Sequence, residues 1–568
     1  MPTRLVSHAS TALLNDAPGR TDEPVWMAGP PSSGGWTSSG RFAAAVIAAV
    51  VIVSAVLAFV LVPRDAPPAV GADRPGEVDA VVVGSAPLSW DPQAAGDAAS
   101  AATLAQVYEG LTAFDAQSQV QPALARAWSV EDKGRRLVFE LRPGVTFSDG
   151  SPITAEDVVA SWLRLIDPER PSPLASLLSD VVGADQYRLG AGDAADVGLR
   201  ADGDRLTVEF RRPASYFIAV TASPSLAVLP EARAAERPGR ELPSEMVVSG
   251  AYIPVEQTAT AIRLEANERY WAGPPALGAI ELLTDLEGQS PVALFEAERV
   301  DHVSVGSLDA SWIRYDAELG PQLRNVDALS VDYYGFDVTE PPFDDRQVRR
   351  AFSMAVDWDR LIGLTESGTD PATSLVPLGV PGRPETDLSP EYDPAAARAA
   401  LEEAGFPEGR GFPTVTLTSS GSAYDEAVAT ELGEVLGITI EVELRPFGQY
   451  LDLLDGDPPA FWGLSWIADY PHPHDFLGLL LQTGSSSNQG GWSDARFDAT
   501  VEDAASTDDL SEQAELYAEA ERIVQAEAPL IPLAYGERWS LSRDGLLGAG
   551  ESGVGFLRLA GLAWADGR

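Results

Sequence analysis

The chain has 568 residues, of which 45% are hydrophobic and 22% are charged, and its formal net charge is −46. A chain of this length exceeds what one hydrophobic core fills, so we expect two or more lobes. The acidic charge argues against nucleic acid as a partner, because phosphate binding needs clustered cations and Lys133 is the only lysine. The absence of cysteine excludes disulfides, thiolate metal sites, cysteine nucleophiles and lipid attachment through a thiol.

A run of 21 residues without a charged side chain, apolar apart from Ser54, extends over 42–62. At about 1.5 Å rise per residue its length matches the ~30 Å hydrocarbon core of a bilayer, and we predict a transmembrane anchor helix there. The alternative is a cleaved signal peptide, with Val70-Gly71-Ala72 as the small-residue cleavage site. Residues 1–41 are predicted to form a disordered tail, and the Pro/Ala/Gly-rich segment 63–77 a linker.

Strands and helices alternate in the pattern of the remaining chain. Alternating apolar residues predict strands at 137–141, 206–210 and 440–444. Such alternation with helices predicts an α/β fold, with sheets covered by helices on both faces.

Three helices have clear sequence signals. Thr154 is expected to cap the first, with Asp157 three residues on. Its apolar face is formed by Val158, Trp162 and Leu165. A second helix is predicted from about Asp344 to Arg360, and a third after Asp393 that stops at Gly405.

Motifs of catalysis and cofactor binding are missing from the sequence. There is no G-x-S-x-G, H-E-x-x-H or Walker A segment. Residues 548–553 match G-x-G-x-x-G but lack the flanking strand and helix that dinucleotide binding needs, so we interpret them as a loop. His472 and His474 lie in a proline-rich turn without further ligands, and no metal site is expected. We therefore expect neither an enzyme nor a cofactor.

A series of short segments follows one order along the chain. They are Tyr108–Leu111, Pro122–Ala125, Phe139–Gly150, Pro152–Val158, Ser249–Tyr252, Pro342–Asp345, Glu403–Phe406 and Ala468–Pro471. This collinear series resembles the peptide/nickel-binding family (family 5) of ABC transporter solute-binding proteins, which includes oligopeptide and dipeptide binders.

The resemblance implies an α/β, two-lobed periplasmic-binding-protein-like fold of class II type with an extra inserted domain, here preceded by one transmembrane helix. The solute-binding domain would cover 78–568. Its parts would be lobe one at 78–107, 196–310 and 530–568, the inserted domain at 108–195, and lobe two at 311–529.

By the same resemblance, the protein is expected to be the extracytoplasmic substrate-binding component of a bacterial ABC importer. It would capture peptides by hinge closure and deliver them to a membrane permease, as a monomer tethered to the cell membrane by its N-terminal helix. Two alternatives stay open. The same fold could bind another solute, such as a nickel chelate or an oligosaccharide, or it could serve as a membrane-tethered sensor or a hydrolase.

The resemblance also points to one ligand-binding segment. In peptide-binding relatives, the aspartate that matches Asp469 pairs with the α-ammonium group of the ligand. An ammonium group enclosed by closing lobes loses its hydration, and a nearby carboxylate offsets that cost. The extended residues before it, including Ser465, Trp466 and Ile467, would offer backbone groups to the ligand. The alternative for Asp469 is an ordinary loop carboxylate before a Tyr-Pro turn.

Two further tryptophans, Trp462 and Trp492, are candidates for pocket walls. One feature departs from the family. Oligopeptide binders can carry a basic residue just upstream of the aspartate, for the carboxylate of the ligand, whereas 460–464 contains none. The anchoring of the ligand's C-terminus, and with it the ligand's length, is therefore left open.

Overall fold

The computed structural model describes residues 78–94, 97–170, 172–233, 236–243, 245–363, 370–384, 387–389, 391–485 and 487–565. The tail, the transmembrane helix and the linker expected over 1–77 lie outside the described residues. Within the described ranges, no helix combines the length and the apolar character needed to cross a membrane.

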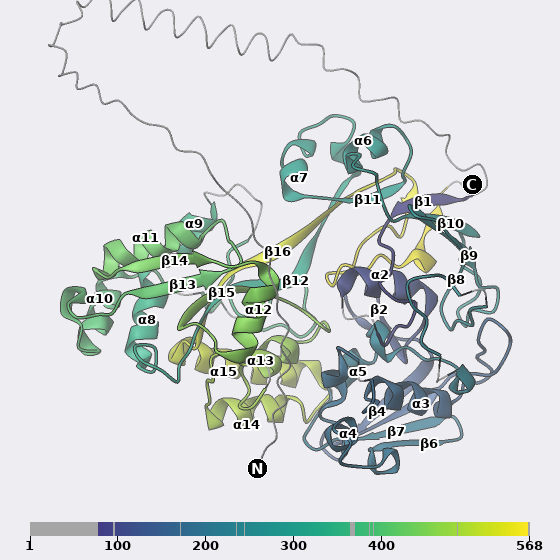
Figure 1. The fold of residues 1–568 in the computed structure, drawn as a ribbon, viewed down its shortest axis with the longest axis horizontal. Helices are drawn as coiled ribbons and strands as arrows, with labels where there is room; N and C mark the ends of the chain where they lie inside the picture. Colours follow the sequence, from purple (N-terminus) through teal and green to yellow (C-terminus); the bar gives the residue numbers. More distant parts are fainter. Residues whose placement is uncertain are drawn as a thin grey trace, which may run out of the picture. The chain divides into compact units, whose positions relative to one another are not determined.

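A mixed sheet of ten strands runs through the described part of the chain (Figure 1). From one edge to the other its strands are β14 (Ile440–Leu444), β13 (Val415–Ser419), β15 (Phe461–Ile467), β12 (Leu323–Phe336), β16 (Leu530–Ser542), β11 (His302–Val305), β1 (Ala80–Val83), β10 (Ala279–Leu283), β9 (Ala261–Ala266) and β8 (Tyr252–Gln257). The strand predicted at 440–444 is confirmed as β14.

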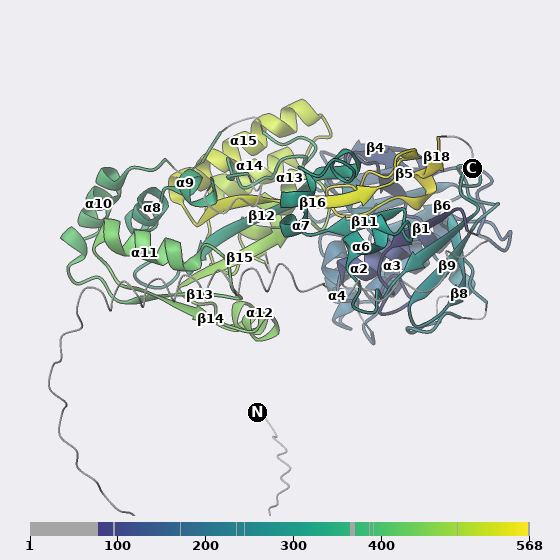
Figure 2. The same ribbon diagram turned by 90° about the horizontal axis from the view of Figure 1, so that it is seen from above.

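Strands β12 and β16 connect the two halves of this sheet (Figure 2). They pair with each other antiparallel from Leu323↔Leu541 to Gly335↔Leu530. Their register shifts between Asp327 and Val331, so the ladder is interrupted partway along both strands. One half of the sheet continues through β15, β13 and β14, and the other through β11, β1, β10, β9 and β8.

A second sheet of four antiparallel strands is separate from the first. Its order is β4 (Ala125–Glu131), β5 (Arg136–Leu141), β7 (Arg205–Glu209) and β6 (Leu199–Asp202). The strands predicted at 137–141 and 206–210 are confirmed as β5 and β7. Strands β6 and β7 belong to this sheet although they lie beyond residue 195, where we expected the inserted domain to end.

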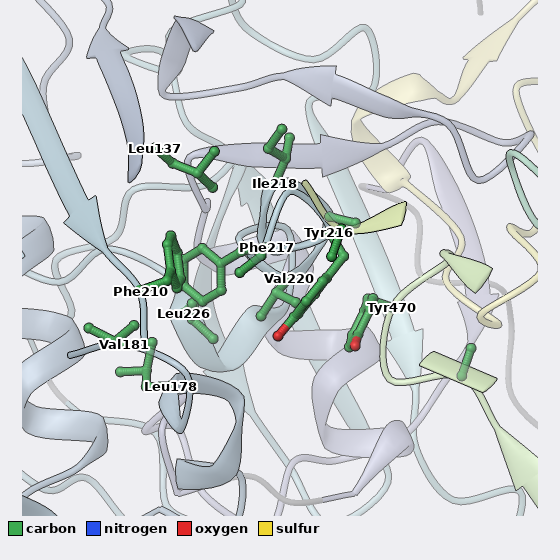
Figure 3. Packing of buried hydrophobic residues seen from close by; sticks show 14 of the residues in the cluster. Leu137, Leu178, Val181, Phe210, Tyr216, Phe217, Ile218, Val220, Leu226 and Tyr470 are labelled. Carbon is green, nitrogen blue, oxygen red and sulfur yellow. The ribbon is translucent and has the colours of Figure 1, made fainter. Parts of the chain in front are cut away.

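Helix α3 (Ala155–Leu165) covers the second sheet and begins as its sequence predicts. Thr154 accepts a hydrogen bond from the backbone N–H of Asp157, and the Asp157 carboxylate accepts one from the backbone N–H of Thr154, which makes a complete capping box. Trp162 is fully buried in the same core as Leu137 and Phe139. The apolar residues of β5, β7 and α3 therefore pack in one hydrophobic core, part of which is drawn in Figure 3.

The prediction of a single helix over 344–360 is wrong in one respect. The chain forms two helices there, α8 (Arg346–Ala355) and α9 (Trp358–Gly363). The break lies at Val356, whose backbone is extended (φ −111°, ψ 133°). Asp357 then accepts a hydrogen bond from the backbone N–H of Arg360 at 3.1 Å, as a residue capping a new helix does.

The helix predicted after Asp393 is confirmed as α10 (Pro394–Glu403), which packs against α8 and α11 (Asp425–Leu436). The other helices of the described residues are α2 (Ala98–Val107), α4 (Ala184–Arg188), α5 (Phe217–Val220), α6 (Pro291–Glu296), α7 (Ser307–Ile313), α12 (Phe447–Gly456), α13 (Pro473–Leu481), α14 (Ala495–Ala504) and α15 (Leu510–Glu527). Two short antiparallel pairs complete the strands, β2 (Thr112–Phe114) with β3 (Val120–Pro122) and β17 (Leu546–Leu547) with β18 (Ala563–Trp564).

Candidate functional site

Strand β15 has one open edge along its C-terminal half. On one side it pairs with β12 over its whole length, from Phe336↔Phe461 to Ser330↔Ile467. On the other side it pairs with β13 through Phe461 and Trp462 alone. The Tyr450 hydroxyl of α12 donates a hydrogen bond to the Gly463 carbonyl at 2.7 Å, so the unpaired part of this edge begins after Gly463. Among the described strands none pairs with 464–467 on this side, so an added strand can pair there.

Asp469 lies just beyond the end of this open edge. The backbone N–H of Ala468 still donates to the Leu329 carbonyl of β12 at 2.8 Å, so the segment remains attached to the sheet. Within the described part of the chain, the Asp469 carboxylate makes no hydrogen bond and no ion pair. Asp469 is exposed to solvent, yet the surrounding protein displaces part of its hydration and raises the pKa to about 6. The carboxylate is therefore exposed, partly desolvated and without a partner among the described residues.

Asp475, in the first turn of α13, holds the Asp469 turn in place. It is fully buried, and its carboxylate accepts hydrogen bonds from the Trp466 indole N–H at 2.7 Å and from the backbone N–H groups of Asp469 at 3.1 Å and Tyr470 at 3.4 Å. Burial, and next the charge of Asp469, raise its pKa well above the usual range. Two neighbouring carboxylates thus share a site where a cation would relieve their repulsion.

The residues predicted to precede Asp469 in the site lie in sequence order along the open edge. Ile467 is 52% exposed, and the Trp466 indole is fixed by Asp475. The exposed Ser465 hydroxyl donates to the Asp332 carboxylate on β12, whose pKa is raised by burial. The structure therefore brings four of the six predicted residues together: Ser465, Trp466, Ile467 and Asp469.

The other two predicted residues are buried in cores. Trp462 is 3% exposed and packs with Tyr450 and Leu454 beneath α12. Trp492 is 5% exposed, and its ring meets that of Phe497 edge-to-face at 5.0 Å. Neither presents its ring openly at the edge of β15, and their contact with a ligand stays a prediction.

A stack of aromatic rings packs against α13, next to the Asp469 turn. The ring of His474 on α13 stacks on Tyr216, with centroids 3.6 Å apart and planes 7° from parallel. The Tyr470 hydroxyl lies 2.9 Å from His474 Nδ1, and the Tyr470 ring stacks near Tyr216 at 5.9 Å (Figure 3). Burial, and next the charge of Arg212, lower the pKa of His474 well below its usual value, so this ring is neutral.

Sequence reasoning missed several residues of this site. Asp475, Asp332, Tyr450 and Tyr216 act through contacts with residues that are near in space. Asp475 alone was within reach, because it lies in the same Asp-Tyr-Pro-His-Pro-His-Asp segment as Asp469. No sequence pattern predicts that a carboxylate is fully buried and accepts hydrogen bonds from backbone N–H groups.

The sheet defines a class of protein. In one half of the long sheet, β1 pairs parallel with β10 and β11. The antiparallel strands β16 and β12 join this half to the half formed by β15, β13 and β14. This arrangement is an α/β fold of the periplasmic-binding-protein-like type. A solved structure of the same type, the periplasmic murein tripeptide-binding protein MppA in its unliganded open form, matches with a TM-score of 0.73. The match covers 85% of this chain and 96% of that one at 24% identity, and it concerns the fold.

The family follows from a second comparison. The family model described as bacterial extracellular solute-binding proteins, family 5 (middle), matches residues 119–488. The chain therefore belongs to this family, and the resemblance found in its sequence is confirmed.

Curated relatives span most of the chain. The probable deoxycholate-binding periplasmic protein YgiS of Escherichia coli is 29% identical over 79% of this chain and 86% of its own length. The periplasmic oligopeptide-binding protein OppA of Salmonella typhimurium is 28% identical over 80% of this chain and 86% of its own. The dipeptide-binding protein DppE of Bacillus subtilis is 26% identical over 84% and 90%.

Proposed function

We propose that this protein is the extracytoplasmic substrate-binding component of an ABC importer and that its cargo is peptides. The observation that carries the proposal is Asp469, a partly desolvated carboxylate without a partner among the described residues, at the end of an open strand edge. An uncompensated carboxylate in such a place favours a ligand with a cationic end, and an open edge favours a ligand with a main chain. A peptide with a free N-terminus has both.

In the proposed complex, the α-ammonium group of the peptide binds Asp469. The main chain lies along 464–467 and pairs with the backbone groups that β13 leaves free. Because every peptide has the same main chain, this mode favours broad selectivity for side chains. Relatives with printed names such as oligopeptide-binding and dipeptide-binding protein support this cargo.

Closure and delivery complete the proposed role. The two halves of the long sheet would act as lobes that close on the ligand, with β12 and β16 flexing where their register shifts. The closed monomer would then dock on a membrane permease. We retain the proposal of an anchor helix over 42–62, with the binding domain on the extracytoplasmic side, since a tether raises the concentration of receptor near the permease. No bond is made or broken in this cycle.

Blocking the N-terminus of a peptide tests the proposal. Trialanine at about a hundredfold excess over Kd is expected to raise the melting temperature of the purified protein by about 3 °C. N-acetyl-trialanine is expected to leave the melting temperature unchanged, because acetylation removes the ammonium charge. Equal stabilisation by both peptides would exclude recognition of the ammonium group.

A second candidate cargo comes from the likeness to YgiS, whose printed name is deoxycholate-binding. Deoxycholate is an anion, and an anion beside Asp469 would meet a carboxylate without a compensating cation. We therefore favour peptides. Stabilisation by deoxycholate without any response to trialanine would reverse this preference and favour a non-peptide solute.

The pKa of Asp469 predicts how peptide binding depends on pH. Only the ionised carboxylate pairs with an ammonium group, and the pKa is raised to about 6 in the unliganded protein. Affinity for trialanine is therefore expected to fall as pH falls through 6, and to be about tenfold weaker near pH 5 than near pH 7. Calorimetric titration across this range measures the effect. An affinity that stays constant down to about pH 5 would show that Asp469 does not pair with the ligand.

A further inference from the structure

Asp332 is a carboxylate on β12, one strand away from the open edge of β15. It pairs in register with Ser465, so the two side chains lie on the same face of the sheet. The Ser465 hydroxyl donates a hydrogen bond to the Asp332 carboxylate. Among the described residues this is the only hydrogen bond of that carboxylate, and no cation of those residues forms an ion pair with it. Asp332 is therefore a negative charge without a cationic partner in that part of the chain.

Burial dominates the electrostatics of Asp332. The residue is half-buried, and burial raises its pKa above the usual value, whereas the hydrogen bond from Ser465 lowers it. The carboxylate has thus lost part of its hydration and gained one neutral donor in exchange. A cationic group that reaches it replaces this lost hydration with a charge-assisted hydrogen bond.

Ser465 separates Asp332 from the open edge with a short side chain. Ser465 is exposed, and Ile467, the next residue on the same face, is 52% exposed. Trp466 between them projects to the other face, where its indole N–H donates to Asp475. A residue of an added strand opposite Ser465 would project its side chain to the face of Ser465 and Asp332. The three side chains would then form one row across the sheet.

A long basic side chain fits this row. Neighbouring strands are about 4.8 Å apart, so the Cα atoms of the ligand residue and of Asp332 would be about 10 Å apart, with Ser465 alone between them. Lysine and arginine carry their charge at the end of long flexible stems, and the Asp332 side chain shortens the gap from its own end. A short apolar side chain in the same place would leave the carboxylate unpaired, and an acidic one would repel it.

Side-chain alternation gives the position of this residue in the peptide. Ile467 is the last residue of β15, so a first peptide residue opposite it has its ammonium group nearest to Asp469. The main chain then runs antiparallel to β15, which places the third residue opposite Ser465. The side chain of the second residue lies on the other face, with Trp466.

We propose that Asp332 is a specificity-determining residue that binds a lysine or arginine side chain at the third position of the peptide. This assignment rests on the proposed function and names its substrate class, which is cationic peptides of at least three residues. The net charge of −46 favours the same class, because an acidic surface attracts cationic ligands over a distance.

Two isomeric peptides test the assignment. Ala-Ala-Lys-Ala and Ala-Lys-Ala-Ala have the same composition, net charge and free N-terminus, and they differ only in the position of the lysine. We expect the wild type to bind Ala-Ala-Lys-Ala about tenfold more tightly in calorimetric titrations, because only its lysine faces Asp332. Asp332→Asn is expected to bind the two isomers with equal affinity. Asp327→Asn, at an exposed aspartate of the same strand, is the matched control and is expected to keep the tenfold preference.

Ser465→Leu is a second variant that does not alter a buried group, since Ser465 is exposed. A leucine there fills the space between the ligand residue and Asp332, and it removes the hydroxyl that orients the carboxylate. The preference for Ala-Ala-Lys-Ala is therefore expected to fall below about twofold. An undiminished preference in Ser465→Leu would contradict the row of side chains on which the assignment depends.

The remaining outcomes separate the assignment from the function beneath it. If the wild type binds both isomers equally or prefers Ala-Lys-Ala-Ala, or if Asp332→Asn keeps the tenfold preference, the assignment of Asp332 is wrong while peptide binding stands. If the wild type binds neither isomer and does not bind tetraalanine, the proposed function itself is wrong.

Discussion

The Asp469→Asn variant is expected to bind peptides with a free N-terminus about 100-fold more weakly than the wild type, or worse. Asparagine keeps the shape of the side chain but has no charge to offset the desolvation of an ammonium group. The loss should be confined to peptides with a free N-terminus, so N-acetylated peptides should bind both proteins equally weakly. Calorimetric titration with trialanine and N-acetyl-trialanine measures both effects.

Asp503→Asn is the matched control for this variant. Asp503 is exposed on α14, away from the open edge of β15, and its substitution should leave Kd unchanged. A wild-type Kd for Asp469→Asn would contradict the proposed ammonium site. Equal losses in the two variants would mean that net charge, and not a local pair, attracts the peptide.

The same variant should be more stable than the wild type when no ligand is present. The folded pKa of Asp469 lies above the value of about 3.9 in an unfolded chain, so its ionisation opposes folding at neutral pH. The melting temperature of Asp469→Asn is therefore expected to exceed that of the wild type near pH 7. The difference should shrink as pH falls through 6, where the wild-type carboxyl becomes protonated. Lost binding with gained stability is typical of a functional residue.

Local signals in the sequence were enough to predict helices and strands whose ends are set by residues nearby in the chain. The capping box of Thr154 and Asp157 fixes the start of α3, because both partners lie within one turn. The helix expected over 344–360 divides at Val356 for a reason that the apolar stripe does not contain. Val356 is fully buried in an extended conformation, and Asp357 behind it caps the next helix. Tertiary burial overrides periodicity at that residue.

For the candidate site, the sequence indicated one segment but none of its surroundings. Asp469 and the residues before it were found through the family motif, and the structure places them in order along one open edge. The open edge itself depends on where β13 stops pairing, which no local pattern encodes.

Tyr216 is a further residue that the sequence does not reveal, and its replacement is expected to have the largest effect on stability. It lies more than two hundred residues before His474, yet the two rings stack at 3.6 Å and the Tyr216 hydroxyl donates to Asp180. Tyr216→Ala removes a buried ring and leaves a cavity, so it should lower the free energy of unfolding by about 3 kcal/mol or more. Tyr216→Phe keeps the stack and should cost only about 1 kcal/mol.

Urea unfolding followed by tryptophan fluorescence measures these costs, with Tyr315→Ala as the matched control. Tyr315 is 84% exposed, so its loss should change the free energy of unfolding by less than about 0.5 kcal/mol. Because Tyr470 and His474 adjoin the Asp469 turn, Tyr216→Ala should also weaken trialanine binding about tenfold, through a looser turn. If Tyr216→Ala costs no more than Tyr315→Ala, the contact between Tyr216, at the start of α5, and α13 does not support the site. A stability loss with an unchanged Kd would mean that the contact holds the fold together without positioning Asp469.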